Sequence, residues 1–488
     1  MSARQDRIEG TLLATAAGDA LGAPYEFGPP LSADQQVVMQ PGGPWKIGEW
    51  TDDTAMMIAI AEVAADGLDL RDQAAQDLLV QRWYDWSLRS KDVGIQTGSV
   101  LRGAARDGVA TAERARAAAV GYHGRAMRGT GNGSLMRTAA VALACLDDEG
   151  ALVEAARAVS DLTHHDPLAG DACVLWCSAI RHAVRTADID ARVGLPHLPA
   201  GRRRLWEGYL AEAESSRPAD FAENGFVVQA LQGAWSAICG TPPPPDDPAS
   251  GQYRAQHLRH ALESAVRGGR DADTVAAIAG GLLGAAYGAS AVPLEWREKL
   301  HGWPGMRAHH LVNLAAAVSR RGEPDRSDLS YRGSATATLV RHPHDDRVLL
   351  GGIGALRALP TEVDAVVSLC RLADGDLRGH PHEDPRRDLV HVEVRLVDSA
   401  APDENPHLDF VLLEAARAVE RLRARGRTVL VHCVAAYSRT PTVAALYGAR
   451  RSGLTTAEAL ADVQAALPDS CPNPAFRGAL DRLEGSRC

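Results

Sequence analysis

The stretch TDDTAMMIAIAEVAA, residues 51–65, predicts the fold of the first part of the chain. Its threonines and acids cap helix N-termini, and the apolar residues that follow recur at helical spacing. The stretch DADTVAAIAGGLLGAAY, residues 271–287, has the same layout. We therefore predict helices over 55–65 and 275–287. Because apolar residues keep this helical pattern up to about Arg320, the first part is predicted to be all-α.

The two helix starts carry more acid than capping requires. A cap needs one short polar residue, and capping alone can explain a single Asp-x-Asp-Thr motif. Here the two helix starts together bring four carboxylates and two threonine hydroxyls. Packing carboxylates together is costly unless a cation neutralises them. Hard oxygen ligands suit Mg²⁺ or Mn²⁺ better than Zn²⁺. If the two starts converge, they can bridge a pair of ions, and such a pair activates a bound water.

Five motifs occur in order within residues 5–305. They are Gly18-Asp19-Ala20-Leu21-Gly22-Ala23-Pro24-Tyr25-Glu26, Thr51-Asp52-Asp53-Thr54, Gly131-Asn132-Gly133-Ser134-Leu135-Met136-Arg137, Thr163-His164-His165-Asp166-Pro167 and Asp271-Ala272-Asp273-Thr274. In this order they resemble the motifs of the ADP-ribosylglycohydrolase family. Any one of them alone is a weak signal, but the ordered set is specific.

The resemblance implies an all-α fold with two Mg²⁺ (or Mn²⁺) ions at the base of a cleft and hydrolysis of the C1″ glycosidic bond of ADP-ribose. The implied metal ligands are Thr51, Asp52, Asp53, Asp271, Asp273 and Thr274, with Asp53 and Asp273 central to catalysis. The implied substrate contacts are Glu26 at the cleft mouth, Gly131, Asn132, Gly133, Ser134 and Met136 in a glycine loop, and His164. A lone histidine is equally often structural. The leaving group stays open between an arginine guanidinium, a serine hydroxyl, a nucleobase and a small metabolite.

The pattern of apolar residues changes after the polar stretch SRRGEPDRSDLSYR, residues 319–332. Short β-branched runs follow at 347–350, 365–369, 392–397 and 428–431, and they alternate with helical patterns at 408–425 and 441–452. Such alternation is typical of an α/β domain. We predict an all-α domain over residues 1–320, a linker over 321–332 and an α/β domain over 333–488.

The α/β part contains the segment VLVHCVAAYSRT, residues 429–440, in which a strand runs into Cys433 and Arg439 opens a helix. A loop curled between strand and helix points its amides at a phosphate, and the helix N-terminus adds positive potential. The same field stabilises a thiolate, and the guanidinium binds two phosphate oxygens. A bare Cys-x5-Arg is more often a buried cysteine near a surface arginine. Here the preceding His432 and the closing Ser-Arg-Thr-Pro favour the functional interpretation.

Together these features resemble dual-specificity-type protein phosphatases over about residues 330–480. The resemblance implies that Cys433 forms a phosphocysteine, Arg439 and Ser438 bind phosphate, Thr440 assists the second step and His432 tunes the thiol. The general acid is expected to be Asp398, with Asp403 as the alternative. No cofactor is expected in this domain.

One residue departs from the phosphatase pattern, because Ala436 stands where the family usually has glycine. If the position needs a positive φ, alanine costs about 1 kcal/mol. The leading hypothesis is therefore a bifunctional enzyme. The alternative is an active ADP-ribosylhydrolase whose second domain is a slow or inactive phosphate-binding module that targets a phosphorylated partner. A third hypothesis, that both domains only sense their ligands, fits poorly with the complete metal-ligand set.

The charge and composition of the chain exclude some classes of binding partner. The net charge of -10 argues against sequence-blind nucleic-acid binding, which needs a basic surface. No pair of cysteines has Cys-x-x-Cys spacing, the N-terminus lacks a signal-peptide layout, and the most apolar stretch, 274–292, is predicted to be a buried helix. We expect a cytoplasmic protein without membrane contact. Its expected partners are an ADP-ribosylated protein or small molecule and a phosphorylated protein or metabolite.

Overall fold

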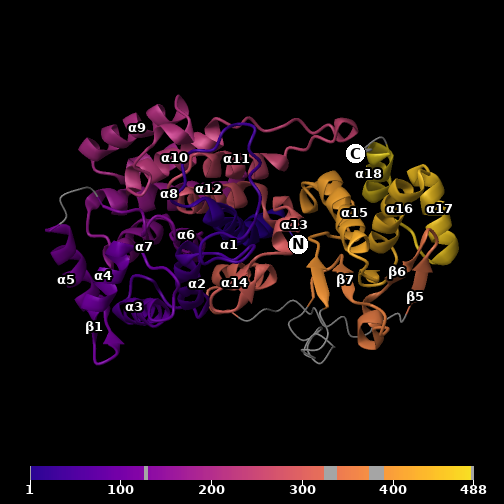
Figure 1. Cartoon of the computed structure of the whole chain (residues 1–488), viewed down its shortest axis with the longest axis horizontal. Coiled ribbons are helices and arrows are strands. Elements are labelled where there is room, and N and C mark those ends of the chain that lie inside the picture. The colour runs from indigo at the N-terminus through magenta and orange to yellow at the C-terminus, as the bar shows by residue number, and fades with distance from the viewer. Residues whose placement is uncertain (1, 126–129, 324–337, 373–388, 485–488) are drawn as a thin grey trace.

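The computed structural model describes residues 2–125, 130–323, 338–372 and 389–484. Figure 1 shows a helical part beside a part that contains a sheet. The helices of the first part are α1 Ala3–Gly22, α2 Asp52–Ala65, α3 Gln73–Ser87, α4 Ile95–Ala104, α5 Ala112–His123, α6 Ala139–Ala144, α7 Glu149–Asp161, α8 Pro167–Thr186, α9 Ala200–Glu214, α10 Val227–Cys239, α11 Gln256–Arg267, α12 Ala272–Tyr287, α13 Leu294–Arg297 and α14 Ala308–Arg320. Two small hairpins join them, β1 Ala105–Arg106 with β2 Val109–Ala110, and β3 His301–Gly302 with β4 Met306–Arg307.

Helices α1 and α12 form the centre of this part and run antiparallel with their backbones in contact. A Cβ atom on Gly18 would lie 2.2 Å from the Ala276 carbonyl oxygen, and one on Gly10 would lie 2.5 Å from that of Gly284. No side chain larger than hydrogen fits at such contacts. Every residue of α12 is buried, so the predicted buried helix is confirmed. The close packing fixes both helices relative to each other, and the residues at their ends with them.

The second part is built on a mixed sheet with the order β5-β6-β9-β7-β8. Its elements are β5 Leu339–His342, β6 Asp345–Gly351, β7 Ala365–Ser368, β8 Val390–Glu393, β9 Val429–His432, α15 Leu408–Ala424, α16 Arg439–Ser452, α17 Thr456–Ala466 and α18 Pro474–Leu483. Strand β5 pairs antiparallel with β6, and the other pairings are parallel. The predicted α/β class is confirmed.

Two details of the sheet differ from the prediction. The strand expected over 392–397 is β8, and it ends at Glu393 because Arg395 turns away from the sheet into the helical part, where its side chain is 4% exposed. The edge strand β5 was not predicted. The predicted linker, 321–332, falls largely outside the described residues: α14 ends at Arg320, and β5 begins at Leu339. The domain boundaries therefore stay a prediction.

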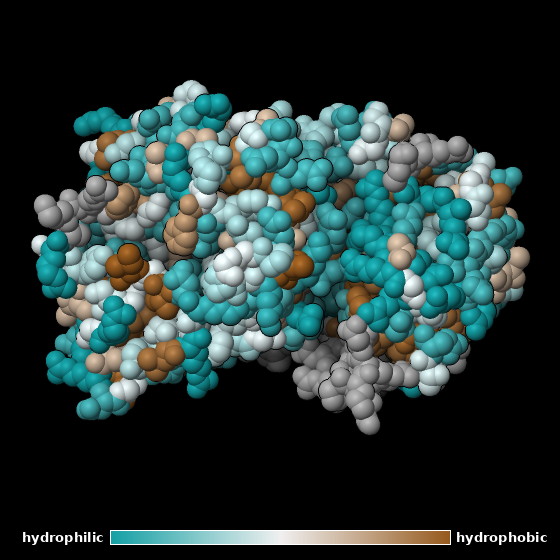
Figure 2. All heavy atoms as spheres, in the orientation of Figure 1, coloured by the Kyte–Doolittle hydropathy of each residue, from teal (hydrophilic) through white to brown (hydrophobic). Residues whose placement is uncertain are grey.

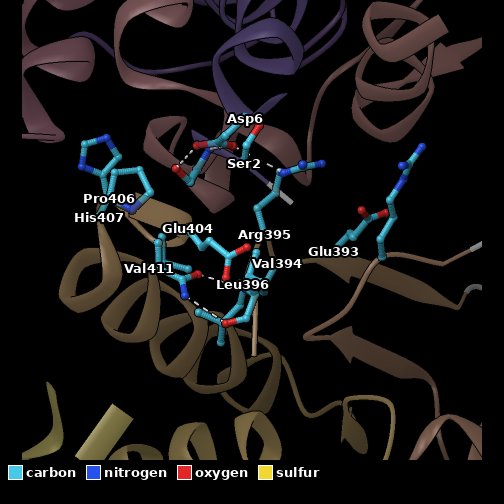
Figure 3. A pocket seen from close by; sticks show the side chains of 14 residues that line it. Ser2, Asp6, Glu393, Val394, Arg395, Leu396, Glu404, Pro406, His407 and Val411 are labelled. Atoms are coloured by element: carbon cyan, nitrogen blue, oxygen red, sulfur yellow. Dashed lines mark hydrogen bonds and ion pairs between the residues drawn. The ribbon is translucent and has the colours of Figure 1, made fainter. Parts of the chain in front are cut away.

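The two parts meet through ion pairs and hydrogen bonds (Figure 3). Arg395 contacts Asp6 of α1, as the figure shows, and it also pairs with Glu9 of the same helix. His407 Nε2 donates to the carbonyl oxygen of Tyr287, 2.9 Å away. Arg421 of α15 pairs with Glu298 at 2.8 Å. The N-terminal end of α1 thus lies at the junction, as Figure 1 also shows.

Hydrophilic residues cover most of the face in Figure 2, and apolar residues appear there in small separate groups. Among the described residues, no helix combines the length and apolarity that a membrane crossing requires.

Candidate active sites

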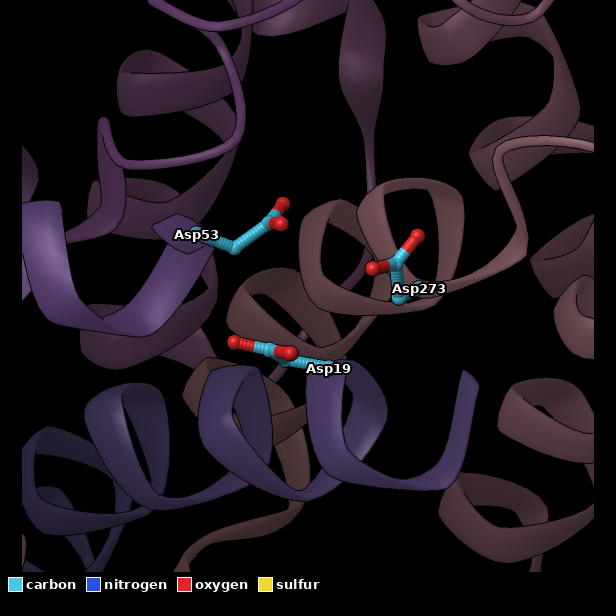
Figure 4. Close-up of side chains that lie close together, drawn as sticks. All are labelled: Asp19, Asp53 and Asp273. Carbon is cyan, nitrogen blue, oxygen red and sulfur yellow. The ribbon is translucent and has the colours of Figure 1, made fainter. Parts of the chain in front are cut away.

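The starts of α2 and α12 converge on one buried group of side chains. Asp53 lies in the first turn of α2, and its Oδ2 accepts hydrogen bonds from the hydroxyls of Thr51, at 3.0 Å, and Thr274, at 3.3 Å. The Asp273 side chain faces Asp53 from the start of α12 (Figure 4), and its Oδ1 accepts from the Thr274 amide at 2.9 Å. The two acidic motifs therefore meet at one place, which is the condition that a shared ion site requires.

Asp19 is a third member of this group, and its role was missed from the sequence. One carboxylate oxygen from each of Asp19, Asp53 and Asp273 lies within 4.8 Å of the others. Asp19 also fixes the start of α2, since it accepts from the backbone amides of Thr51 at 2.9 Å and Thr54 at 3.0 Å. Its signal was an acid inside an apolar helix, because a fully buried carboxylate needs partners.

A second group of carboxylates adjoins the first. Oxygen atoms of Glu26, Asp271 and Asp273 also lie within 4.8 Å of one another, so Glu26 lies beside the cluster, closer to it than its expected place at the cleft mouth suggests. Asn132 of the glycine loop donates its Nδ2 to Asp271 Oδ2 at 2.8 Å. Asp52 is half-buried, and its Oδ2 accepts from the Gly94 amide at 3.4 Å. Three of the four predicted carboxylates, Asp53, Asp271 and Asp273, thus belong to these groups, whereas Asp52 contacts Gly94 beside them.

Burial and mutual repulsion raise the pKa of these acids. Burial first, and then neighbouring acids, raises the pKa of Glu26 to about 8 and that of Asp52 to about 7. Burial raises the pKa of Asp19 to about 6. For Asp53 and Asp273, burial and the surrounding carboxylates raise the pKa well above the usual range.

The residues fit a divalent cation. Among the described residues, the buried Asp53 Oδ1 has no hydrogen-bond partner. Such an atom is costly unless a ligand satisfies it, and a cation would also remove the repulsion between the acids. The donors are carboxylates and hydroxyls, the set that Mg²⁺ and Mn²⁺ prefer.

The glycine loop lies against His164. The imidazole is buried, its Nδ1 hydrogen-bonds the Thr163 hydroxyl at 2.8 Å, and burial lowers its pKa well below the usual value, so the ring is neutral. A Cβ on Gly133 would lie 3.1 Å from the ring. Ser134 and Met136 are buried, and the Ser134 hydroxyl accepts from Ser160 at 3.0 Å. These contacts hold the loop in place, which favours a structural part for His164 and Ser134.

The cysteine segment forms the expected strand–loop–helix. Strand β9 ends at His432, Cys433 follows and is buried, and α16 begins at Arg439. Nη1 of Arg439 donates to the carbonyl oxygens of Leu369 and Leu396, at 3.0 and 3.2 Å. Its Nε, also buried, has no hydrogen-bond partner among the described residues. A donor left free beside the loop suits a ligand with acceptor oxygens.

Asp398 lies next to Arg439, with 3.7 Å between Oδ2 and Nε. Asn473 donates its Nδ2 to Asp398 Oδ1 at 3.1 Å, and its backbone amide donates to the Ser438 hydroxyl at 3.2 Å. Asn473 therefore joins the candidate acid to the phosphate loop, a part that the sequence did not reveal. Asp403 lies in a short 3₁₀ turn, Pro402–Glu404, in which no residue is buried.

Thr440 and His432, the two residues expected to assist Cys433, both make hydrogen bonds within their own domain. The Thr440 hydroxyl donates to the Gly351 carbonyl oxygen at 3.3 Å, so it is engaged with the end of β6. His432 shares the Ser368 hydroxyl with His391, at 2.7 and 2.9 Å.

Comparison with known proteins agrees with this geometry. Residues 1–328 match the family model described as ADP-ribosylglycohydrolase, and they make up most of the chain. The chain belongs to the ADP-ribosylglycohydrolase family. Residues 374–485 match the model of the dual specificity phosphatase catalytic domain. The protein is therefore a hydrolase with a phosphatase-type domain fused behind it. From here, "hydrolase domain" denotes the matched residues 1–328, and "phosphatase domain" denotes residues 338–484.

Three relatives illustrate the match. ADP-ribosylarginine hydrolase Tri1 of Pseudomonas putida is 30% identical over 65% of this chain and 78% of its own length. ADP-ribosyl-[dinitrogen reductase] glycohydrolase of Rhodospirillum rubrum is 30% identical over 60% of this chain and 90% of its own. Dual specificity protein phosphatase 1 of Arabidopsis thaliana is 33% identical over 20% of this chain and 48% of its own, so the matched stretch spans about half of that relative.

Ala436 adopts a φ of 56°, the left-handed conformation that favours glycine. We expect Ala436→Gly to stabilise the phosphatase domain by up to about 1 kcal/mol, because relief of this strain outweighs the extra entropy of glycine in the unfolded chain. The melting temperature of that domain should rise by about 2–4 °C. Ala435→Gly is the neighbouring control and should lower it. No rise in Ala436→Gly would mean that the loop carries no strain there.

Burial lowers the pKa of His432 to about 4. The native ring is neutral, whereas the unfolded ring takes a proton below about pH 6.5, so this group costs stability as pH falls from about 6.5 toward 4. We expect His432→Gln to destabilise the protein at about pH 7.5 and the deficit against wild type to shrink by about 2 kcal/mol at about pH 5. Thermal unfolding across this range measures it. The exposed His123→Gln is the control, and a deficit that stays constant with pH would contradict the expectation.

Proposed function

We propose that the hydrolase domain removes ADP-ribose from a modified target by cleaving the C1″ glycosidic bond with the help of two Mg²⁺ or Mn²⁺ ions. The observation that carries this proposal is that carboxylate oxygens of Asp19, Asp53 and Asp273 lie within 4.8 Å of one another, while Asp53 Oδ1 has no hydrogen-bond partner in the described part of the chain. Thr51, Asp52, Asp53, Asp271, Asp273 and Thr274 would hold the ions. When bound, the ions supply the positive charge that orders the ribose hydroxyls and lowers the pKa of a water.

The chain's own residues have separate parts in this proposal. Asp19 fixes the first turn of α2, so that Thr51 and Asp53 point into the site. Asn132 orients Asp271 and ties the glycine loop to the cluster. Glu26 borders the same cluster and can contact the substrate or gate its entry.

The relative named ADP-ribosylarginine hydrolase supports arginine as the first linkage to test. We would offer the purified protein arginine-, serine- and nucleic-acid-linked ADP-ribose with Mg²⁺, with EDTA and as Asp273→Ala. The expected result is metal-dependent release from one linkage, lost in the variant. No release from any linkage would exclude these substrates, and small-molecule conjugates of ADP-ribose would be tested next.

We further propose that the phosphatase domain hydrolyses phosphomonoesters through a phosphocysteine. Cys433 forms the S–P bond while the P–O bond to the leaving group breaks, and Asp398 gives that oxygen its proton. Arg439 binds the phosphate, and its free Nε and its place beside Asp398 support this assignment. The alternative, a slow or inactive phosphate-binding module, is favoured by the left-handed Ala436. Turnover of a phosphomonoester by the wild type separates the two.

The fusion favours related substrates for the two sites. The enzyme can erase ADP-ribose and phosphate from one protein, or it can act in sequence on a phosphorylated ADP-ribose metabolite. A target carrying both modifications, followed by mass spectrometry, distinguishes the two schemes.

A further inference from the structure

The loop that carries Asp398, residues 394–407 between β8 and α15, is held at both ends by the hydrolase domain. At its start, Arg395 lies three positions before Asp398, is buried and pairs with two acids of α1, of which Figure 3 shows Asp6. At its end, His407 donates to the carbonyl oxygen of Tyr287, the last residue of α12, at 2.9 Å. The loop is therefore anchored outside its own domain.

The Arg395 contact is a built ion pair. Its Nη1 pairs with Glu9 Oε2 and its Nε lies 3.4 Å from Asp6 Oδ1, and the side chain of Glu9 is fully buried. Both acids have further support, because Gln5 donates to Glu9 at 2.9 Å and the Ser290 amide donates to Asp6 at 3.1 Å. A buried charge that loses its partner is strongly destabilised, so Arg395 has one preferred position.

The anchored Arg395 restricts the backbone that leads to Asp398, because Asp398 is only three positions further along the chain. The carbonyl oxygen of Leu396, the next residue, accepts from Arg439 Nη1 at 3.2 Å. Val397 exchanges two hydrogen bonds of 2.9 Å with the side chain of Asn405. Asp398 follows and faces Arg439 Nε. The backbone between Arg395 and Asp398 thus has little freedom once Arg395 is anchored.

We infer that Arg395 and Glu9 position the general-acid loop, so that proton transfer in the phosphatase site depends on this contact between the two domains. The inference rests on the proposed phosphatase activity. Arg395 is a positioning residue: it touches neither the phosphate nor the leaving group, and acts through Leu396 and Asp398. The phosphatase site is then complete only when the hydrolase domain is docked against it.

The test uses the full chain and two substrates. An ester of an acidic phenol, p-nitrophenyl phosphate, needs little help from an acid, whereas phenyl phosphate needs protonation of its leaving group. Glu9→Gln should lower kcat on phenyl phosphate by about 10²-fold and change kcat on p-nitrophenyl phosphate by less than about threefold. ADP-ribose release should stay unchanged. Equal losses on both esters, or no loss on either, would overturn the inference.

The matched control is an ion pair that joins the same two domains at another place. Glu298 binds Arg421 of α15 at 2.8 Å, outside the 394–407 loop, so Glu298→Gln should affect both esters equally. Because Glu9→Gln takes away one of the two acids that pair with the buried Arg395, the double variant Glu9→Leu/Arg395→Met provides a second test that removes both charges of the Arg395–Glu9 pair. It should show the same selective loss on phenyl phosphate.

Hydrogen exchange separates failure of the inference from failure of the proposed activity. Peptides covering residues 394–407 should exchange faster in Glu9→Gln than in wild type or Glu298→Gln, whether or not either ester is turned over. Unchanged exchange would refute the anchoring. If these peptides exchange faster in Glu9→Gln but wild type hydrolyses neither ester, the anchoring stands and its catalytic consequence is refuted. The phosphatase domain would then be a binding module.

Discussion

Replacement of Asp53 by asparagine should abolish ADP-ribose release and, at the same time, stabilise the protein in EDTA. Asp53 lies at the centre of the cluster, and burial together with the carboxylates of Asp19 and Asp52 raises its pKa well above the usual range. Without a cation, an asparagine there removes a buried carboxyl whose ionised form is disfavoured by burial and by the neighbouring acids. With a cation, it removes a ligand, and we expect kcat to fall by about 10³-fold or more.

Thermal unfolding with and without Mg²⁺ measures the second half of this prediction. Wild type should gain stability on adding Mg²⁺, because a ligand that binds only the native state stabilises it. Asp53→Asn should start higher in EDTA and gain less. Asp171→Asn is the control: this buried aspartate pairs with Arg157 and Arg202, so its loss should destabilise the protein equally with and without Mg²⁺. A variant that loses stability in EDTA would show that Asp53 is held by partners other than a cation.

The carboxylate cluster was largely predictable because the signals were local. Thr51, Asp53 and Asp273 each stand at the start of an apolar helix, and two such starts rich in acid point to a shared ligand. Asp19 was different, because its function depends on the amides of α2, more than thirty positions away in the chain. Only the packing of α1 against α12 and α2 places it in the cluster.

In the phosphatase domain, too, the local features were predictable and the contacts with distant residues were not. The order of strand, cysteine and arginine is local, and so is the demand on Ala436, whose positive φ was foreseen as a condition for strain. The end of β8 was not predictable. Arg395 stands in a run of β-branched residues, and nothing in that run indicates that its side chain leaves the sheet to meet Glu9. Contacts between domains carry no periodicity, so a single sequence does not reveal them.

Cys433→Ser should reduce phosphomonoester hydrolysis by about 10³-fold or more, because a serine hydroxyl in this loop has no base to activate it. ADP-ribose release should be unchanged, since the carboxylate cluster lies in the other domain. The variant should still bind orthophosphate, because Arg439 and the loop amides remain. Phosphate release and calorimetric binding of orthophosphate measure the two effects. Cys471→Ser is the control: this exposed cysteine lies outside the loop, donates its backbone amide to the Tyr437 carbonyl oxygen at 2.7 Å and hydrogen-bonds the Tyr437 side chain through its thiol, a contact that a serine hydroxyl can keep.

The comparison with wild type decides between an enzyme and a binding module. If wild type turns over and Cys433→Ser does not, while both bind orthophosphate, the cysteine is the nucleophile. If both bind and neither turns over, the domain is a targeting module, and Ala436→Gly becomes the decisive variant, because alanine at a φ of 56° stands where the family usually has glycine. Turnover gained in Ala436→Gly would mean that strain at this residue silences an otherwise complete site. Turnover that survives in Cys433→Ser would assign the reaction to another residue.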